Sequence, residues 1–136
     1  MATTRATATR HGPAVELAFG LGDLRRVRRR VTELCRHAGF DRRRAEEITV
    51  AVNELAANSV DHGGGRGMVR AWLEGDALVV EVADAGHLAD PERAGRTPPR
   101  VDQARGRGLW LVRQLTDSLD IRPTPEGTLF RAVVRR

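Results

Sequence analysis

Three side chains able to do chemistry recur one helical turn apart near the middle of the chain. Glu54, Asn58 and His62 stand at four-residue spacing in the stretch "NELAANSVDHGG". At about 100° per residue, they would spread over roughly 80° of a helix and so share one face. The carboxylate can take a proton from an attacking hydroxyl or water, and the amide oxygen suits a hard cation such as Mg²⁺. A solvated helix face explains the spacing as well, and His62 can equally be a capping residue.

The residues around this polar face favour a binding site over a solvated face. A run of glycines, 63–65, follows directly, and glycines let a backbone approach closely whatever the helix holds. The other side of the same helix carries side chains that are expected to pack on a sheet: Ile48, Val52, Leu55 and Ser59. The chemistry as a whole would suit a magnesium nucleotide.

Two further stretches carry weaker signals of the same kind. "VADAG" places Asp84 and Gly86 at the end of an expected strand, where the carboxylate can accept a hydrogen bond from the exocyclic amine of adenine. "GRGLWLV" begins a helix with Gly106 and Gly108, so that free backbone N–H groups of its first turn can point toward a phosphate. Each pattern alone is common, since Asp-x-Gly is a frequent turn and many helices begin near glycine.

Hydrophobic spacing predicts the elements that must position these groups. Apolar residues at intervals of three and four predict a first helix that Asp23 caps and Gly39 ends, and a second that Asp41 caps and that runs to about Asp61. A third helix is expected over 107–119. Alternation and turn residues predict strands over 14–19, 68–75, 76–84, 120–123 and 128–136. This order predicts an α/β (α+β) two-layer sandwich with a mixed, mostly antiparallel sheet that helices cover on one face.

Two segments stand apart from these elements. Residues 86–105 have no sustained apolar period and are rich in Gly, Pro and Arg. They predict a long mobile loop, and loops of this length in compact domains are usually functional. Residues 1–12 are polar and are expected to form a disordered tail, outside a single domain over 13–136.

The composition narrows the class of protein. A length of 136 residues fits one domain. The single cysteine, Cys35, cannot form an internal disulfide and is expected to be buried, which favours a reducing, cytoplasmic location. No apolar run approaches the roughly 20 residues needed to cross a bilayer. We therefore expect no membrane partner.

The positive charge is carried by arginine alone. The formal net charge is +5 and the chain contains no lysine, a bias more typical of a GC-rich genome than of selection for a surface. The run "RRVRRR" at 25–30 can be a solvated face, a contact for an acidic partner, or a nucleic-acid contact. No aromatic residue interleaves with it, which disfavours base stacking. We expect no direct nucleic-acid partner.

Taken in series, the three stretches resemble the nucleotide-binding domain of the GHKL ATPases, which include gyrases, histidine kinases and heat-shock chaperone ATPases. The N-box and the two glycine boxes are represented by Glu54, Asn58 and His62-Gly63, then Asp84 and Gly86, then Gly106 and Gly108. The short chain and its ending "IRPTPEGTLFRAVV" are similar, more narrowly, to the anti-sigma-factor serine kinases of bacteria, especially actinomycete versions. The resemblance covers nearly the whole chain.

The resemblance implies a Bergerat-type fold of the histidine-kinase-like ATPases, with ATP bound between helices and an ATP lid at about 86–105. It implies that Asn58 holds Mg²⁺, that Asp84 reads adenine and that Glu54 is the catalytic base. Further nucleotide contacts are implied for His62, Gly86, Arg105, Gly106, Arg107, Gly108, Leu109 and Thr128.

The implied function is that of an ATP-binding anti-sigma factor and serine-protein kinase. Such a protein sequesters a sigma factor, phosphorylates an anti-anti-sigma protein of the STAS type, and forms a homodimer. The alternative is a nucleotide-gated binding switch without phosphotransfer. Glu54 favours the kinase, whereas Leu88 keeps the alternative open, because the first glycine box usually has a second glycine at this position. That departure puts the hinge freedom of the lid in question.

Overall fold

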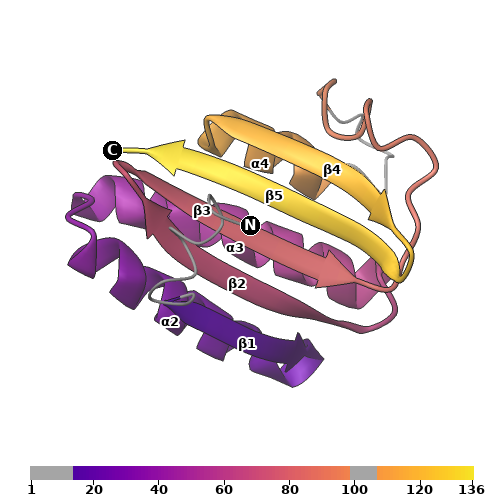
Figure 1. Cartoon of the computed structure of the whole chain (residues 1–136), viewed down its shortest axis with the longest axis horizontal. Coiled ribbons are helices and arrows are strands. Elements are labelled where there is room, and N and C mark those ends of the chain that lie inside the picture. Colours follow the sequence, from indigo (N-terminus) through magenta and orange to yellow (C-terminus); the bar gives the residue numbers. More distant parts are fainter. Residues whose placement is uncertain (1–13, 99–106) are drawn as a thin grey trace, which may run out of the picture.

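The computed structural model describes residues 14–98 and 107–136 and has two layers, a single sheet and helices behind it (Figure 1). The sheet has five strands in the order β1-β2-β3-β5-β4, and the pairing is antiparallel throughout. The strands are β1 Val15–Gly20, β2 Arg66–Glu74, β3 Ala77–Asp84, β4 Ser118–Thr124 and β5 Gly127–Arg135. The predicted two-layer sandwich is therefore confirmed.

Helices cover one face of this sheet. They are α2 (Leu24–His37), α3 (Arg42–His62) and α4 (Arg107–Leu115), with a short 3₁₀ turn, η1 (Leu21–Asp23), between β1 and α2. The longest helix, α3, lies behind β2 and β3, while α2 lies behind β1 and α4 behind β4 (Figure 1). In the described part of the chain, no helix has both the length and the apolar character needed to span a membrane.

The two aspartates expected to cap helices behave differently. Oδ1 of Asp41 accepts a hydrogen bond from the backbone N–H of Arg44 at 2.8 Å, which satisfies a free donor in the first turn of α3. Asp23 stands at the N-cap of α2, but its Oδ2 accepts from the backbone N–H of Gly20 at 2.9 Å. The side chain of Asp23 therefore closes the 3₁₀ turn, and the expected cap of α2 is one of position only.

Alternation along the strands divides the sheet into a packed face and an open face. On the packed face, Val82 lies opposite Val69 on one side and Phe130 on the other, and all three are at most 1% exposed. The same core contains the buried apolar residues of α3, including Ile48, Val52 and Leu55. The predicted sheet-facing side of this helix is confirmed, and it includes Ser59, whose exposure is 0%.

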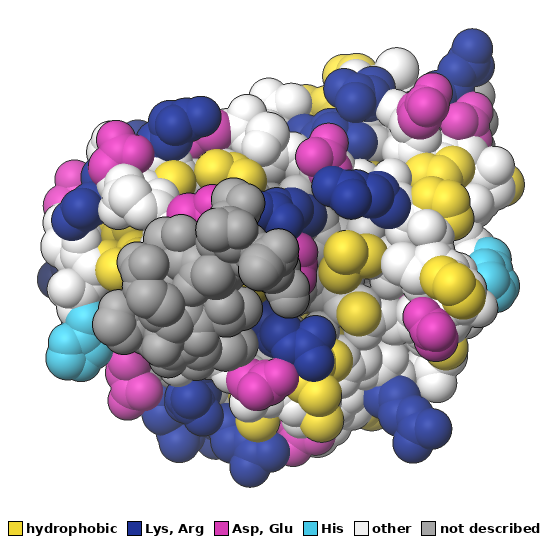
Figure 2. Space-filling model, viewed as in Figure 1, with side chains coloured by type: hydrophobic (Ala, Val, Ile, Leu, Met, Phe, Trp, Pro, Cys, Tyr) yellow, Lys and Arg dark blue, Asp and Glu magenta, His cyan; other side chains and the backbone are white. Residues whose placement is uncertain are grey.

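The open face carries a row of alternating charges, and blue and magenta side chains lie among apolar ones in Figure 2. Cross-strand register places in this row Glu16, Arg70, Glu81, Arg131 and Asp120. Nε of Arg70 lies 2.8 Å from Glu16, and Arg131 lies 3.2 Å from Glu81. Each such cross-strand pair contributes roughly 0.2–1 kcal/mol. Because a slip of one residue would move every charge to the core face, the row also holds β3 and β5 in register.

The third helix ends earlier than the apolar period predicts. We expected it over 107–119, but α4 ends at Leu115 and β4 begins at Ser118. Leu119 fits the helical spacing, yet it pairs with Ala132 of β5 and is 3% exposed. The hydroxyl of Thr116 donates to the carbonyl oxygen of Val112 at 2.7 Å, a local bond that competes with further helix. Burial in the sheet decides the conformation of Leu119.

The single thiol provides a test of the packing between α2 and the sheet. Burial raises the pKa of Cys35 to about 11, so near pH 8 its thiolate fraction is about 100-fold lower than that of a thiol with the ordinary pKa of 9.0. We expect native protein to react with a thiol-specific chromogenic disulfide at pH 8 only as fast as the domain opens, and at once in guanidinium chloride. Reaction at the rate of a free thiol in native buffer would contradict this packing.

Candidate functional site

The carboxylate of Asp84, the last residue of β3, is held from two sides. Its Oδ2 accepts a hydrogen bond from the hydroxyl of Ser59 on α3 at 2.6 Å, and its Oδ1 accepts one from the backbone N–H of Gly86 at 2.9 Å. The side chain is half-buried. Each carboxylate oxygen has more than one lone pair. The group is thus oriented and can still accept a hydrogen bond from a ligand.

The backbone around Asp84 is packed too closely for any side chain but hydrogen. A Cβ at residue 63 would lie 2.2 Å from Oδ2 of Asp84, and a Cβ at residue 86 would lie 2.6 Å from the carbonyl oxygen of His62. A Cβ at residue 127 would lie 2.0 Å from the carbonyl oxygen of Asp84. Glycines 63, 86 and 127 therefore let the end of α3, the end of β3 and the start of β5 meet at one point.

Thr128, on β5, contacts the turn that follows Asp84. It lies opposite Asp84 in the sheet register, is 4% exposed, and donates its hydroxyl proton to the carbonyl oxygen of Gly86 at 2.7 Å. The hydroxyl is thus engaged with the turn that follows β3. The structure brings this sequence-predicted residue next to Asp84 and Gly86.

Glu54 lies where α3 passes the first turn of α4. A Cβ at residue 108 would lie 2.7 Å from Oε1 of Glu54, so glycine at this position lets the carboxylate lie directly against the first turn of α4. The carboxylate is half-buried, and the N-terminal turn of a helix favours a negative charge beside it. The structure therefore joins the predicted N-box glutamate to the predicted second glycine box.

Asn58 and His62 follow Glu54 along the same face of α3. Asn58 is half-buried and His62 is exposed. Within the described chain, no hydrogen bond or ion pair engages the side chains of these three residues. Also among the described residues, no three His, Cys, Asp or Glu side chains are grouped to hold a metal ion. A cation here would depend on the amide oxygen of Asn58 together with oxygens of a ligand, as Mg²⁺ with phosphate does.

The remaining predicted nucleotide contacts come, in sequence, at or just before the start of α4. Arg107 is the first residue of the helix. The side chain of Leu109 is 2% exposed and belongs to the core, so only its backbone N–H in the first turn remains for a ligand. Arg105 and Gly106 lie outside the described residues, as do the predicted tail and the last part of the predicted lid.

The described part of the predicted lid, 86–98, contains neither helix nor strand, in agreement with a long loop. A hydrogen bond connects it to the layer of helices: Nε of Arg113 on α4 donates to the carbonyl oxygen of Ala94 at 2.8 Å. A Cβ at residue 95 would lie 2.7 Å from the backbone of Leu109, so Gly95 sits directly on the helix. Leu88 packs against the core.

Sequence reasoning missed two contributors to this site, Ser59 and Gly127. Ser59 lies on the packed side of α3, and a polar residue within an apolar stripe was the available signal, because a buried hydroxyl requires a partner. Gly127 appeared only as part of the turn "TPEG". Its approach to Asp84 depends on the register between β3 and β5, which spacing along the chain does not reveal.

Two solved structures share this fold. The RsbU and RsbW domains of Rv1364c from Mycobacterium tuberculosis match with a TM-score of 0.63 and 23% identity, over 90% of this chain and 33% of that one. The chain thus spans a third of the mycobacterial chain. The SiaB–SiaC complex from Pseudomonas aeruginosa matches with a TM-score of 0.62 and 14% identity, over 98% of this chain and 96% of that one.

No curated protein matches the chain. A family model, described as the histidine kinase-like ATPase domain, matches residues 17–134. This match includes all the elements that surround Asp84, and it confirms the resemblance to the GHKL ATPases. The chain belongs to the histidine kinase-like ATPase domain family.

Proposed function

We propose that this protein is an ATP-binding anti-sigma factor and serine-protein kinase. The observation that carries the proposal is the fixed carboxylate of Asp84, held by Ser59 and Gly86 at a junction of three glycine backbones. The groups proposed for a magnesium nucleotide are carried by α3 and by the neighbouring helix α4, in a chain that belongs to the histidine kinase-like ATPase domain family. The narrower resemblance to anti-sigma-factor kinases supplies the proposed targets.

Adenine recognition would fall to Asp84. Its two oxygens already accept from Ser59 and Gly86, so the carboxylate is pre-oriented and its remaining lone pairs point in fixed directions. Thr128 holds the carbonyl of Gly86 and keeps the turn beside Asp84 in place. A fixed acceptor loses little entropy when the exocyclic amine of adenine arrives.

The phosphates would lie between α3 and the first turn of α4. The first turn of α4 would offer the backbone N–H groups of Gly108 and Leu109 as donors at a helix N-terminus, and residue 108 has no side chain to block them. Asn58 would hold Mg²⁺ through its amide oxygen, and the ion, when bound with the nucleotide, neutralises phosphate charge. His62, one turn further, would stand beside the same phosphates.

Glu54 would act as the general base. Its carboxylate is half-buried beside Gly108, close to where the phosphates would lie, and it has no partner among the described residues. It is therefore available to accept the proton of a serine hydroxyl as that oxygen attacks phosphorus. The serine would belong to an anti-anti-sigma protein, and the sigma factor would be held on a separate surface.

The comparisons support partner binding in general terms. One similar structure was solved as a complex of SiaB with SiaC, and the other contains RsbU and RsbW domains in one chain. A fold of this kind therefore occurs in proteins that assemble with others. The sigma factor, the STAS-type antagonist and a homodimer remain parts of our proposal.

A second function, a nucleotide-gated switch without phosphotransfer, is favoured by Leu88. Where the first glycine box usually has its second glycine, this leucine packs against the hydrophobic core. A partly buried leucine that packs on the core restrains the start of the lid, whereas glycine would leave it free to hinge. Slow lid movement favours long nucleotide residence over turnover.

Asp84→Asn tests the adenine site. The amide offers one acceptor oxygen where Ser59 and Gly86 both donate, and it removes the charge. Because a hydrogen bond to a charged group contributes about 1.5–3 kcal/mol, we expect ATP and ADP to bind about 10- to 100-fold more weakly by calorimetry. Ser59→Ala keeps the carboxylate and should weaken binding less. Unchanged affinity of Asp84→Asn would remove Asp84 from the site.

Gly63→Ala tests the close approach around the carboxylate. The added methyl group would meet Oδ2 of Asp84 at 2.2 Å, so the carboxylate has to move from the position that Ser59 fixes. We expect nucleotide binding to fall at least about tenfold, since misplacement of about 1 Å has effects of this size or larger. Gly22→Ala is the matched control, because its methyl group meets nothing within 4 Å. Equal affinities of the two variants would contradict the proposal.

Glu54→Ala and Asn58→Ala separate the kinase from the switch. A general base contributes about 10²- to 10⁴-fold to rate, so Glu54→Ala should bind Mg-ATP nearly as well as wild type and lose phosphotransfer to a serine-bearing partner. Asn58→Ala should lose both, because the metal loses its protein ligand. The measurements are calorimetry and transfer of labelled phosphate to STAS-type proteins of the same genome.

The outcomes distinguish the two functions. Transfer at the wild-type rate by Glu54→Ala would show that Glu54 is not the base. Tight nucleotide binding by the wild type without transfer to any serine-bearing partner would favour the switch. Sequestration of a sigma factor should survive Glu54→Ala under either function.

A further inference from the structure

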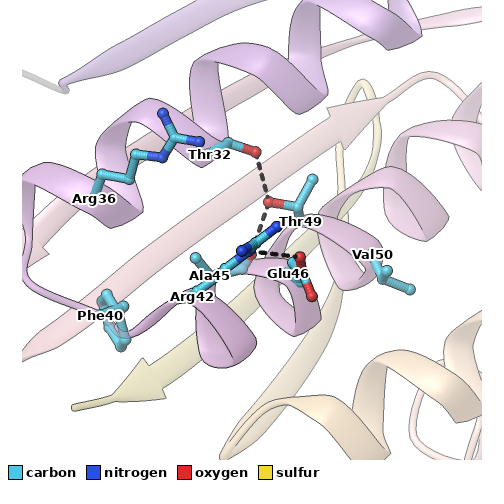
Figure 3. Close-up of a pocket in the computed structure, with 8 residues that line it drawn as sticks. All are labelled: Thr32, Arg36, Phe40, Arg42, Ala45, Glu46, Thr49 and Val50. Carbon is cyan, nitrogen blue, oxygen red and sulfur yellow. Dashed lines mark hydrogen bonds and ion pairs between the residues drawn. The ribbon is translucent and has the colours of Figure 1, made fainter.

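A groove of about 770 Å³ lies between α2 and the N-terminal half of α3 (Figure 3). It is lined from α2 by Thr32 and Arg36, from the connecting turn by Phe40, and from α3 by Arg42, Ala45, Glu46, Thr49 and Val50. None of these residues belongs to the nucleotide site proposed above. The groove and that site lie toward opposite ends of α3.

Polar contacts between the two helices hold the groove open at a fixed width. The hydroxyls of Thr32 and Thr49 lie 3.0 Å apart, and Thr49 also donates to the carbonyl oxygen of Ala45 at 2.8 Å (Figure 3). One turn along, Arg28 donates to Oδ1 of Asn53 at 2.9 Å. These bonds occupy the hydroxyl groups, so the groove offers mainly apolar surface to a ligand.

The apolar surface has an exposed wall. Val50 is 43% exposed, one of a few large hydrophobic residues on the described surface with such exposure. Phe40 and Ala45 are 8% and 4% exposed and belong to the core below. An apolar side chain placed between Val50 and this floor would lose its contact with water, the usual driving force for docking.

Arg36 lines the groove from α2, and two further arginines continue the same face of this helix beyond the groove. Arg25, Arg29 and Arg36 are exposed, and at about 100° per residue they fall within roughly 40° of one another on the helix. None has an ion pair in the described part of the chain. By contrast, each of the three arginines at the start of α3 is paired with a nearby acidic side chain. These three arginines therefore form a cationic stripe without an ion pair in the described chain, and one exposed carboxylate, Glu33, lies on the neighbouring turns of α2.

We propose that this groove docks an acidic segment of a partner protein, with apolar side chains against Val50 and Phe40 and carboxylates on Arg25, Arg29 and Arg36. Charge complementarity between these arginines and an acidic segment identifies the occupant. A second copy would bring the same stripe of arginines, and like charges repel. Nucleic acid would leave the apolar wall unused, and the groove has no exposed aromatic face on which a base could stack.

This docking surface goes beyond the proposed function and does not depend on it. Phosphotransfer and nucleotide binding involve the C-terminal half of α3 and the first turn of α4. The groove uses the N-terminal half of α3 and the outer side of α2. A protein with an inactive nucleotide site would therefore keep this surface, and its failure leaves the nucleotide site untouched.

The test uses a fluorescent peptide of about 16 residues, long enough for roughly four helical turns, with leucines on one helical face and glutamates elsewhere. We expect saturable binding to the wild-type protein in fluorescence anisotropy and amide shifts in nuclear magnetic resonance at Thr32, Thr49 and Val50. The triple variant R25Q/R29Q/R36Q should bind roughly tenfold more weakly, since exposed ion pairs contribute up to about 1 kcal/mol each. Val50→Glu and the milder Val50→Ser should each weaken binding as well.

The matched control is R66Q/R122Q/R135Q, which removes the same charge from exposed arginines outside this surface. It should bind the peptide like the wild type, and so should Asn58→Ala. Equal weakening of peptide binding by the two triple variants would overturn the proposal. Unchanged peptide binding by the Val50 variants would overturn it too. So would tighter binding of a DNA duplex that displaces the peptide, or a dimer in sedimentation that Val50→Glu converts to a monomer.

Discussion

The site depends on one constraint, the close approach of three backbone segments around a single carboxylate. The ends of α3 and β3 and the start of β5 meet with glycine at each contact, and the Asp84 side chain is fixed between them. This approach requires correct register between β3 and β5, which the charged row on the open face supports. The helix layer and the sheet thus have to be assembled before the carboxylate of Asp84 is held in place.

At the same point, a buried hydroxyl group is satisfied by a hydrogen bond. Ser59 is a hydroxyl inside an apolar stripe, and such a group is costly unless it is hydrogen-bonded. Its partner is the carboxylate of Asp84, so one bond satisfies the buried hydroxyl and orients the acceptor that we propose for adenine. This sharing explains why α3 can be both the central packing helix of the domain and the element that carries Glu54, Asn58 and His62.

Local signals in the sequence predicted the architecture, while contacts distant in sequence decided the rest. The apolar period of α3, its Asp41 cap and the β2–β3 hairpin were all predictable, because their causes lie within a few residues. The end of α4 was not, because Leu119 fits a helix and a strand equally well and only its pairing with β5 decides. Spacing placed Glu54, Asn58 and His62 on one face of α3, and Ser59 was signalled only as a polar residue in the apolar stripe, whereas the approach of Gly127 to Asp84 required the register of the sheet.

The length of α3 has a mechanical consequence. This helix has 21 residues, about 31 Å at 1.5 Å per residue. From Thr49, in the groove, to His62 the distance along the axis is about 20 Å. For a rigid helix, a tilt of about 5° pivoting at Thr49 would shift His62 by about 1.7 Å. Because displacements near 1 Å can alter chemistry about a hundredfold, small rotations of this helix would be amplified at the nucleotide site that we propose.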